Sequence, residues 1–348
     1  MKEKSENRKK STMAIREFYE DYATLLGFSG SEILYRIFDI LYDEKNDMKI
    51  LKALPGNIES ISTATGIPVQ ELEPDLDRLW RKGGIGGAFG NYFLLKGLII
   101  LRDMSVMWPE ASQEYWEVWE EMFNKEHERH AAHLNSKHYP PALRVLPVQE
   151  TVDSESQVLD IESAVKVFKD ARIISAVDCA CRLQAKKTGR GQNCPSPDTP
   201  NCFATNLMAE MSLARGIGRQ ISLDEALKRL KECEDAGLVH MARNNVAEDM
   251  VMCNCCACCC HGLHMINDGS YTGAFAPSRF QVRLDADACT GCGTCEERCQ
   301  FKAITVGDIA EIDLDKCFGC GNCVSTCPTE ALVLTEIRPK EFIRVAKR

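Results

Sequence analysis

The sequence predicts an α+β protein of several domains, and three observations lead to this prediction. Its 348 residues are enough for two or three domains of about 150 residues each. All 19 cysteines lie between Cys179 and Cys327, so the composition changes sharply at mid-chain. Near the C-terminus, two cysteine runs repeat at an interval of 28 residues. We therefore expect a mainly helical N-terminal half, a helical Cys-rich middle domain and a duplicated C-terminal domain.

Charge and hydropathy narrow the class of protein. The chain has 42 Lys and Arg against 51 Asp and Glu, a net charge of −9, which argues against broad affinity for nucleic acid or anionic membranes. The most apolar stretch, residues 92–101, is about half a membrane span and contains Lys96. We expect a cytoplasmic protein with no membrane span. In a reducing cytosol, abundant cysteine indicates metal or redox chemistry rather than disulfides.

The first expected domain, residues 1–110, begins with an apolar helical face over residues 31–42. Further helices are expected over 58–65 and 69–82, the latter restarting at Pro74. A glycine-rich turn and the extended segment 91–95 follow. Helix, helix, turn and strand in this order resemble a winged helix-turn-helix.

The second helix of this winged-helix-like module is a poor match for DNA. Its leading end carries Glu71, Glu73, Asp75 and Asp77, and carboxylates there would repel phosphates beside the base edges. We therefore expect no specific nucleic-acid binding. The module is interpreted as a protein–protein unit, with homodimerisation as one use.

A helical connector and linker are expected over residues 111–170. Residues 114–123 carry an aromatic stripe at helical spacing, which we assign to core packing. His127, His130 and His133 recur every three residues and so drift around a helix, which disfavours a metal site.

The Cys-rich domain is expected over residues 171–278. Cys233 sits in an apolar helical pattern opened by the capping box of Ser222 and is interpreted as a core residue. The other cysteines include adjacent ones, which cannot all face one core and would be an oxidation hazard without a metal. The candidate ligands are Cys179, Cys181, Cys194, Cys202, Cys253, Cys255, Cys256 and Cys259.

The sequence does not decide which metal or cluster this upstream site binds. Thiolates favour a third iron–sulfur cluster, and zinc is the alternative. One arrangement joins Cys181, Cys194 and Cys202 to one thiolate within 253–256, and the surplus thiols could hold a second centre. His261 and His264 border the run and are interpreted as polar surface residues.

Two spaced quartets carry the strongest signal. The first is Cys289-x2-Cys292-x2-Cys295-x3-Cys299, and the second is Cys317-x2-Cys320-x2-Cys323-x3-Cys327-Pro328. The flanking residues repeat as well, which indicates an internal duplication. A pair of zinc ions is disfavoured because tandem runs of this spacing are not a zinc arrangement.

These quartets resemble those of the bacterial two-cluster ferredoxins. The resemblance implies a (βαβ)2 ferredoxin-like two-cluster domain over residues 279–348, with a basic C-terminal tail, and two [4Fe-4S] clusters. In that family the fourth cysteine of each run ligates the other cluster. Carried over, this gives one ligand set of Cys289, Cys292, Cys295 and Cys327 and another of Cys317, Cys320, Cys323 and Cys299. Gln300 departs from the family, which usually has proline there.

The resemblance extends less specifically over residues 140–335, to a group of multi-cluster proteins from anaerobes. Ferredoxin modules carry single electrons, so the expected function is electron transfer between partner redox proteins. One alternative is an oxidoreductase whose upstream centre is catalytic, which leaves enzymatic activity open. The other is a redox sensor that uses the winged-helix module.

Overall fold

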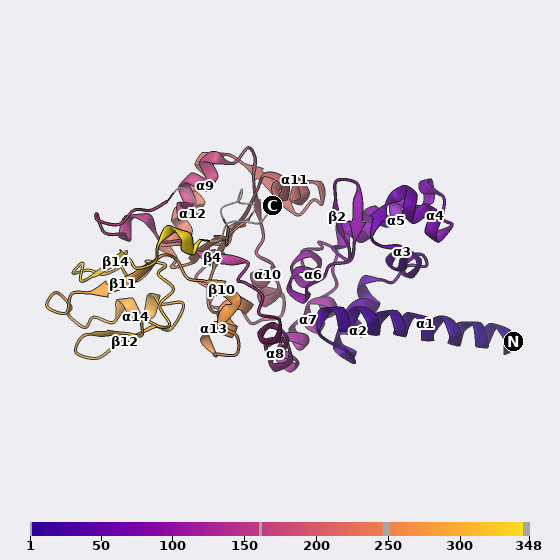
Figure 1. The fold of residues 1–348 in the computed structure, drawn as a ribbon, viewed down its shortest axis with the longest axis horizontal. Helices are drawn as coiled ribbons and strands as arrows, with labels where there is room; N and C mark the ends of the chain where they lie inside the picture. The colour runs from indigo at the N-terminus through magenta and orange to yellow at the C-terminus, as the bar shows by residue number, and fades with distance from the viewer. Residues whose placement is uncertain (1, 160–161, 246–250, 344–348) are drawn as a thin grey trace. The chain divides into compact units, whose positions relative to one another are not determined.

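The computed structural model describes residues 2–159, 162–245 and 251–343 (Figure 1). It contains both helices and sheets, which confirms the α+β class. The chain forms two compact units. The first comprises Met1–His133 and Leu183–Gly189, and the second comprises Leu134–Arg182 and Arg190–Arg348.

The first unit is mainly helical, with one small sheet in the order β1-β3-β2. Its elements are α1 (Lys2–Leu26), α2 (Glu32–Leu41), α3 (Asp47–Ala53), β1 (Gly56–Asn57), α4 (Ile58–Thr65), α5 (Val69–Lys82), β2 (Gly86–Ala88), β3 (Asn91–Phe93), α6 (Leu98–Ser105) and α7 (Gln113–Lys125), followed by α8 (His127–Lys137), which runs into the second unit.

Local sequence signals explain where these helices start and stop. The side chain of Ser31 accepts a hydrogen bond from the backbone N–H of Leu34 and so caps α2. Gly83, in the left-handed region, ends α5. The expected restart at Pro74 is wrong: α5 is continuous from Val69 to Lys82 with Pro74 inside it. The amphipathic pattern on both sides of Pro74, with Leu72 and Leu76 buried, outweighs the one lost backbone hydrogen bond.

The aromatic stripe of α7 forms core, as the sequence predicts. The side chains of Tyr115 and Trp119 are fully buried, and Phe123 stacks on Trp119. Ser112 caps the helix through the backbone N–H of Tyr115. The apolar face of α7 packs against α2 within the first unit.

The second unit is built on a seven-stranded sheet in the order β10-β4-β8-β9-β6-β5-β7. Its elements are β4 (Leu143–Val145), α9 (Ala164–Asp170), β5 (Ile174–Val177), α10 (Ala180–Lys187), which runs into the first unit, β6 (Cys202–Thr205), α11 (Asn206–Ala214), β7 (Gly218–Ile221), α12 (Leu223–Asp235), β8 (Val239–Arg243), β9 (Val251–Cys255), α13 (His261–Asn267) and β10 (Phe275–Ala276), with 3-10 turns η1 (Gln149–Thr151) and η3 (Thr272–Ala274).

The Cys-rich region contains the helices α10 to α13, but the sheet makes it a mixed domain and not the helical one that the sequence predicts. Its strands are only two to five residues long, and cysteines or polar residues occupy many of their positions, so no alternating apolar pattern marks them. All neighbouring pairs in the sheet are antiparallel except β10 with β4. The expectations for α12 are confirmed: Ser222 caps it and Cys233 is fully buried.

The C-terminal part of the second unit has internal pseudo-symmetry. Its elements are β11 (Phe280–Leu284), α14 (Thr294–Arg298), β12 (Ile304–Val306), β13 (Ala310–Ile312), β14 (Leu332–Glu336) and the 3-10 turn η4 (Lys340–Phe342). Strand β12 pairs with β13, and β11 lies beside β14 (Figure 1).

Matching backbone hydrogen bonds show how the two repeats pack. The N–H of Asp285 donates to the carbonyl of Ala331, and 28 residues later the N–H of Asp313 donates to that of Ala303, each over 2.8 Å. The helix expected in the second repeat is not formed as such: residues 322–326 make turns, whereas α14 is helical. There the hydroxyls of Ser325 and Thr326 both donate hydrogen bonds to the backbone carbonyl of Asn322. Such side-chain bonds compete with the backbone hydrogen bonds of a regular helix.

A buried ion pair fixes the start of this C-terminal part. Both Arg279 and Glu162 are 2% exposed, and the guanidinium donates to both carboxylate oxygens of Glu162 over 2.9 Å. Arg279 also pairs over 2.5 Å with Glu336, whose side chain is partly exposed. Removing the buried member of such a group leaves the remaining buried charge poorly compensated. The pair therefore holds Glu162, just before α9, against the start of β11.

We expect Glu162→Ala to lower the free energy of unfolding by about 3 kcal/mol, because it removes the fully buried partner of Arg279 and leaves only the partly exposed Glu336. Chemical denaturation under anaerobic conditions measures this loss. Glu210 is the matched control: its pair with Arg172 is 2.8 Å long but both side chains are largely exposed. Glu210→Ala should cost less than about 1 kcal/mol. Equal losses for the two variants would contradict a structural role for the buried pair.

Candidate metal centres

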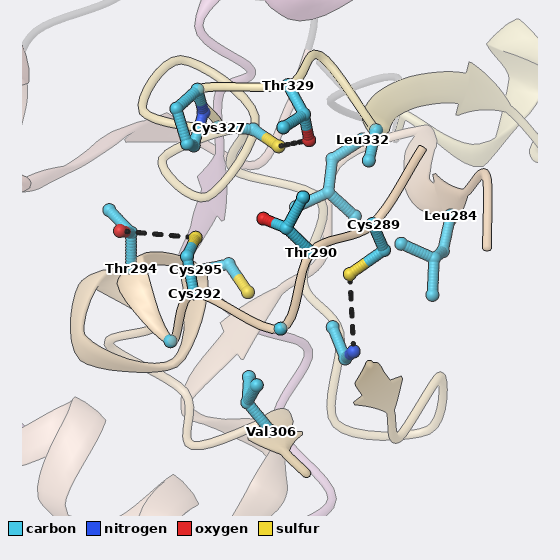
Figure 2. Close-up of a pocket in the computed structure, with 15 residues that line it drawn as sticks. Leu284, Cys289, Thr290, Cys292, Thr294, Cys295, Val306, Cys327, Thr329 and Leu332 are labelled. Carbon is cyan, nitrogen blue, oxygen red and sulfur yellow. Dashed lines mark hydrogen bonds between the residues drawn. The ribbon is translucent and has the colours of Figure 1, made fainter. Parts of the chain in front are cut away.

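A first cavity of about 330 Å³ lies among thiols of both repeats (Figure 2). The cysteines that line it are Cys289, Cys292, Cys295 and Cys327. Leu284, Val306 and Leu332 contribute apolar walls. The pairing of β11 with β14 explains the grouping, because Leu284, just before the first run, lies opposite Leu332, just after Cys327.

A second cavity, of about 360 Å³, is lined by the other four thiols. These are Cys299, Cys317, Cys320 and Cys323. Here the pairing of β12 with β13 explains the grouping of the thiols. Ile304 lies opposite Ile312, which brings the end of the first cysteine run beside the start of the second. Phe301 and Phe318 form one wall as a stacked pair with ring centroids 4.4 Å apart.

The loops around both cavities depend on glycines at equivalent positions. Gly291 and Gly319 have φ angles of +63° and +65°, which side chains rarely adopt. A Cβ at these positions would also collide with the backbone carbonyls of Asp308 and Phe280, respectively. The close backbone approach lets each loop turn its thiols inward.

The two cavities differ in access to solvent. Cys292 is exposed, and the hydroxyl of Thr294, 3.5 Å from its Sγ, lowers the pKa of this thiol. In the second cavity, burial raises the pKa of Cys320 to about 12. Burial also raises the pKa of Cys323 well above its usual value. Such thiols ionise when a metal binds them, so the second cavity suits a metal centre shielded from water.

Backbone amides point at sulfur in both cavities. The N–H of Ala310 donates to Sγ of Cys289 over 3.4 Å, and that of Ala303 donates to Sγ of Cys299 over 3.3 Å. Four convergent thiols, apolar walls and N–H···S hydrogen bonds fit a cubic iron–sulfur cluster.

Upstream, the structure gathers four thiols that we call the thiol tetrad: Cys194, Cys256, Cys258 and Cys259. Their sulfur atoms all lie within 4.8 Å of one another. Sγ of Cys194 is 3.4 Å from that of Cys256, and Sγ of Cys258 is 3.7 Å from that of Cys259. Cys258 is exposed, whereas Cys256 and Cys259 are buried.

The remaining upstream thiols, Cys233 apart, form a second group that we call the six-thiol ring. Its members, in order around the group, are Cys179, Cys181, Cys260, Cys255, Cys253 and Cys202, and each thiol lies near enough to the next for the two to affect each other's ionisation. β6 supplies Cys202 and β9 supplies Cys253 and Cys255, so adjacent strands of the sheet set one side of the ring. Hydrogen bonding with Cys202 lowers the pKa of Cys253 to about 6.

The structure therefore divides the sequence-predicted upstream ligands between two groups. Cys194, Cys256 and Cys259 belong to the tetrad. Cys179, Cys181, Cys202, Cys253 and Cys255 belong to the ring. Cys181 and Cys202 do not join Cys194 in one compact group in the described part of the chain.

Arg182 lies beside the tetrad. Its Nε is 3.4 Å from Sγ of Cys194, and its guanidinium is 3.7 Å from Sγ of Cys256. The side chain is buried, and hydrogen bonds to Asn201 and to the carbonyl of Asn254 hold it in place. Burial alone would lower the pKa of Arg182, but Coulombic attraction to thiolates, Cys179 foremost, outweighs it and raises that pKa. This cation offsets thiolate charge.

Gln300 connects the C-terminal repeats with the tetrad loop. Its side-chain oxygen accepts a hydrogen bond of 2.8 Å from the backbone N–H of Ala257, between two tetrad cysteines. Its side-chain NH2 donates to the carbonyl of Gly237 over 3.1 Å. Proline, which the ferredoxin resemblance leads one to expect here, would offer neither contact.

Several residues of these sites were not singled out from sequence as ligands or contacts. Cys258 completes the tetrad and Cys260 completes the six-thiol ring. The sequence feature that could have identified them as ligands is their place in the dense cysteine run 253–260. Arg182 directly follows Cys181, and only the fold shows its role. The surface interpretation holds for the exposed His264 but is wrong for His261, which is buried where α13 begins.

Comparisons with known proteins agree with the C-terminal geometry. Residues 281–328 match the family model of the 4Fe-4S dicluster domain, so this part of the chain is a ferredoxin-type domain. No curated protein and no solved structure matches the chain. None of the helices in the described ranges is both long and apolar enough to cross a membrane.

Proposed function

We propose that this protein is an electron relay whose two cluster cavities pass single electrons between partner redox proteins and an upstream thiolate centre. The dicluster domain and the wealth of cysteine support an iron–sulfur redox function. The observation that carries the relay is continuous packing from one thiol group to the next. When bound, a [4Fe-4S] cluster accepts and donates one electron at a time.

Shared hydrophobic cores support the order of the centres. One core contains Cys295 of the first cavity and Cys323 of the second. A second core contains Cys255 and Cys260 of the six-thiol ring, and Cys299, Cys317 and Cys320 pack against it. The stacked Phe301 and Phe318 belong to this second core. The order is therefore first cavity, second cavity, six-thiol ring.

The cavities of this series differ in their exposure to solvent, as a relay requires. Exposed Cys292 places the first cavity at the surface, where a partner protein can approach. Exposed Glu296 and Glu297 follow it on α14, which favours a partner with a basic surface. None of the four thiols of the second cavity is exposed, so it suits an internal position. We place the relay in an oxygen-poor cytoplasm, because exposed cluster ligands are sensitive to oxidation.

For the ligands of the two cubes we propose the crossed sets. The cavities support this, since each is lined by three thiols of one run and the last thiol of the other. We propose the six-thiol ring as the site of a third iron–sulfur centre, because it packs against the second cavity and offers more thiols than one tetrahedral ion needs.

Anaerobic purification followed by a reductive titration tests the relay. The full-length protein should accept at least two electrons reversibly, one for each cube, and its EPR spectrum should show coupling between neighbouring reduced clusters. A third accepted electron would come from the upstream centre. Electron uptake of one or none, or zinc without sulfide in the two cavities that the cysteines of runs 289–299 and 317–327 line, would overturn the proposal.

Crossed ligation makes a specific prediction for paired variants. Cys327→Ala combined with Cys289→Ala should lose little iron beyond either single change, since both thiols serve one cube. Cys327→Ala combined with Cys317→Ala should instead lose the iron of both cubes. Iron and sulfide analysis with EPR of the full-length variants measures this. If the Cys327 and Cys317 pair were the non-additive one, ligation would follow sequence proximity instead.

We propose that α3 to β3 form a winged-helix-like module that serves protein contact or homodimerisation. In support, the cations of α5 are all held by carboxylates: Arg78 pairs with Asp47 and Asp75, Arg81 with Asp77 and Lys82 with Asp43. Phosphate contact would have to break these pairs. Phe89, at the turn between β2 and β3, is 86% exposed and offers an apolar contact.

We expect the full-length protein to form a dimer that Phe89→Ser converts to monomer, measured by light scattering at several concentrations. Tyr139→Ser, which changes an exposed aromatic residue outside the module, is the control and should leave the dimer intact. Duplex DNA at physiological salt should cause no sequence-specific change in anisotropy. A specific DNA complex would favour the sensor function instead.

A further inference from the structure

We infer that the upstream cysteines form two centres of different kinds, and that the thiol tetrad is a closed site for a single zinc ion. The ligands are Cys194, Cys256, Cys258 and Cys259. The inference does not rest on the proposed relay, because a structural zinc ion carries no electrons. It assigns the tetrad a separate task from that of the six-thiol ring.

The spacing of the sulfur atoms is the first argument. A zinc ion bound by four thiolates at about 2.3 Å in a tetrahedron holds its sulfur atoms roughly 3.8 Å apart. The tetrad has sulfur pairs at 3.4 and 3.7 Å, with every pair inside 4.8 Å. A cube places four irons and four sulfides between its thiolates, so it needs a wider set. The tetrad is matched to one ion.

The cavities of the dicluster domain provide an internal comparison. Within the described ranges, no three of their eight thiols gather inside 4.8 Å. The same holds for the six-thiol ring. The tetrad is thus the compact exception among the cysteine groups of this chain, and the wider groups include those that match a cluster-binding family.

The backbone at three of the tetrad cysteines forms a tight turn. The N–H groups of Cys259 and Cys260 both point to the carbonyl of Cys256, at 3.4 and 3.1 Å, so residues 256–260 make one tight turn. Three ligands therefore come from one turn. The fourth, Cys194, comes from the irregular segment between α10 and β6. An ion bound by all four would tie this segment to the end of β9.

Charge compensation fits the same ion. Zinc with four thiolates carries a net charge of −2, and two arginines approach the site. Arg182 contacts Cys194 and Cys256 through sulfur. Arg190 donates to the carbonyls of Cys258 and Cys259 at 3.0 and 3.3 Å. Such contacts orient the ligands and stabilise the ionised thiols. Four protein ligands leave no open position, which is typical of structural zinc.

Metal analysis of full-length protein, purified anaerobically, tests the inference. We expect one zinc per chain in addition to iron, and zinc X-ray absorption should show four sulfur neighbours at about 2.3 Å. Cys258→Ser, at the exposed ligand, should lose that zinc while the iron content stays unchanged. Cys233→Ala, a buried cysteine outside both groups, is the matched control and should keep both metals.

The opposite pattern would overturn the inference. Absence of zinc from the wild-type protein, or a loss of about four irons in Cys258→Ser, would make the tetrad part of a cluster site. Because the absorption measurement uses the unaltered protein, the test does not depend on whether a variant folds. Failure of the relay would be recognised separately, by electron uptake, and would leave the zinc result unchanged.

Discussion

Convergent thiols are the constraint on which the second unit depends. Buried thiolates repel one another, and burial without a metal raises the pKa of groups such as Cys320 and Cys323. Bound metal changes this balance because it favours the ionised thiols and links segments far apart in the chain. The short strands of the sheet and the tight loops of the repeats thus present cysteine, where most domains would present larger apolar side chains.

Duplication and strand pairing solve the problem of ligand placement in the C-terminal domain. Because each strand pair contains one strand from each half, every cavity receives thiols from both repeats. Equivalent glycines, Gly291 and Gly319, then let the two loops turn in the same way. A single copy of the repeat would supply only part of either lining, so the two halves are mutually dependent.

The sequence was most informative where a local pattern sets the structure. Residues 58–65 and 69–82 were expected as helices and form α4 and α5, because caps and apolar spacing act within a few residues. The burial of Cys233 followed from the same kind of periodicity. The seven-stranded sheet was missed because its pairing is non-local, and its cysteines mask the apolar pattern. The division of the upstream thiols was equally out of reach, since adjacent cysteines such as Cys259 and Cys260 enter different groups.

The fold explains why Gln300 departs from the ferredoxin pattern. It follows Cys299 of the second cavity, and its side chain binds the backbone of Ala257 in the tetrad turn. The next residue, Phe301, lies in the core that the second cavity shares with the six-thiol ring. Neighbouring positions thus contact both upstream groups. An ordinary ferredoxin has no such groups to contact, so proline is sufficient there. In this chain Gln300 stands in place of that proline, and its side-chain amide binds the backbone of the tetrad turn.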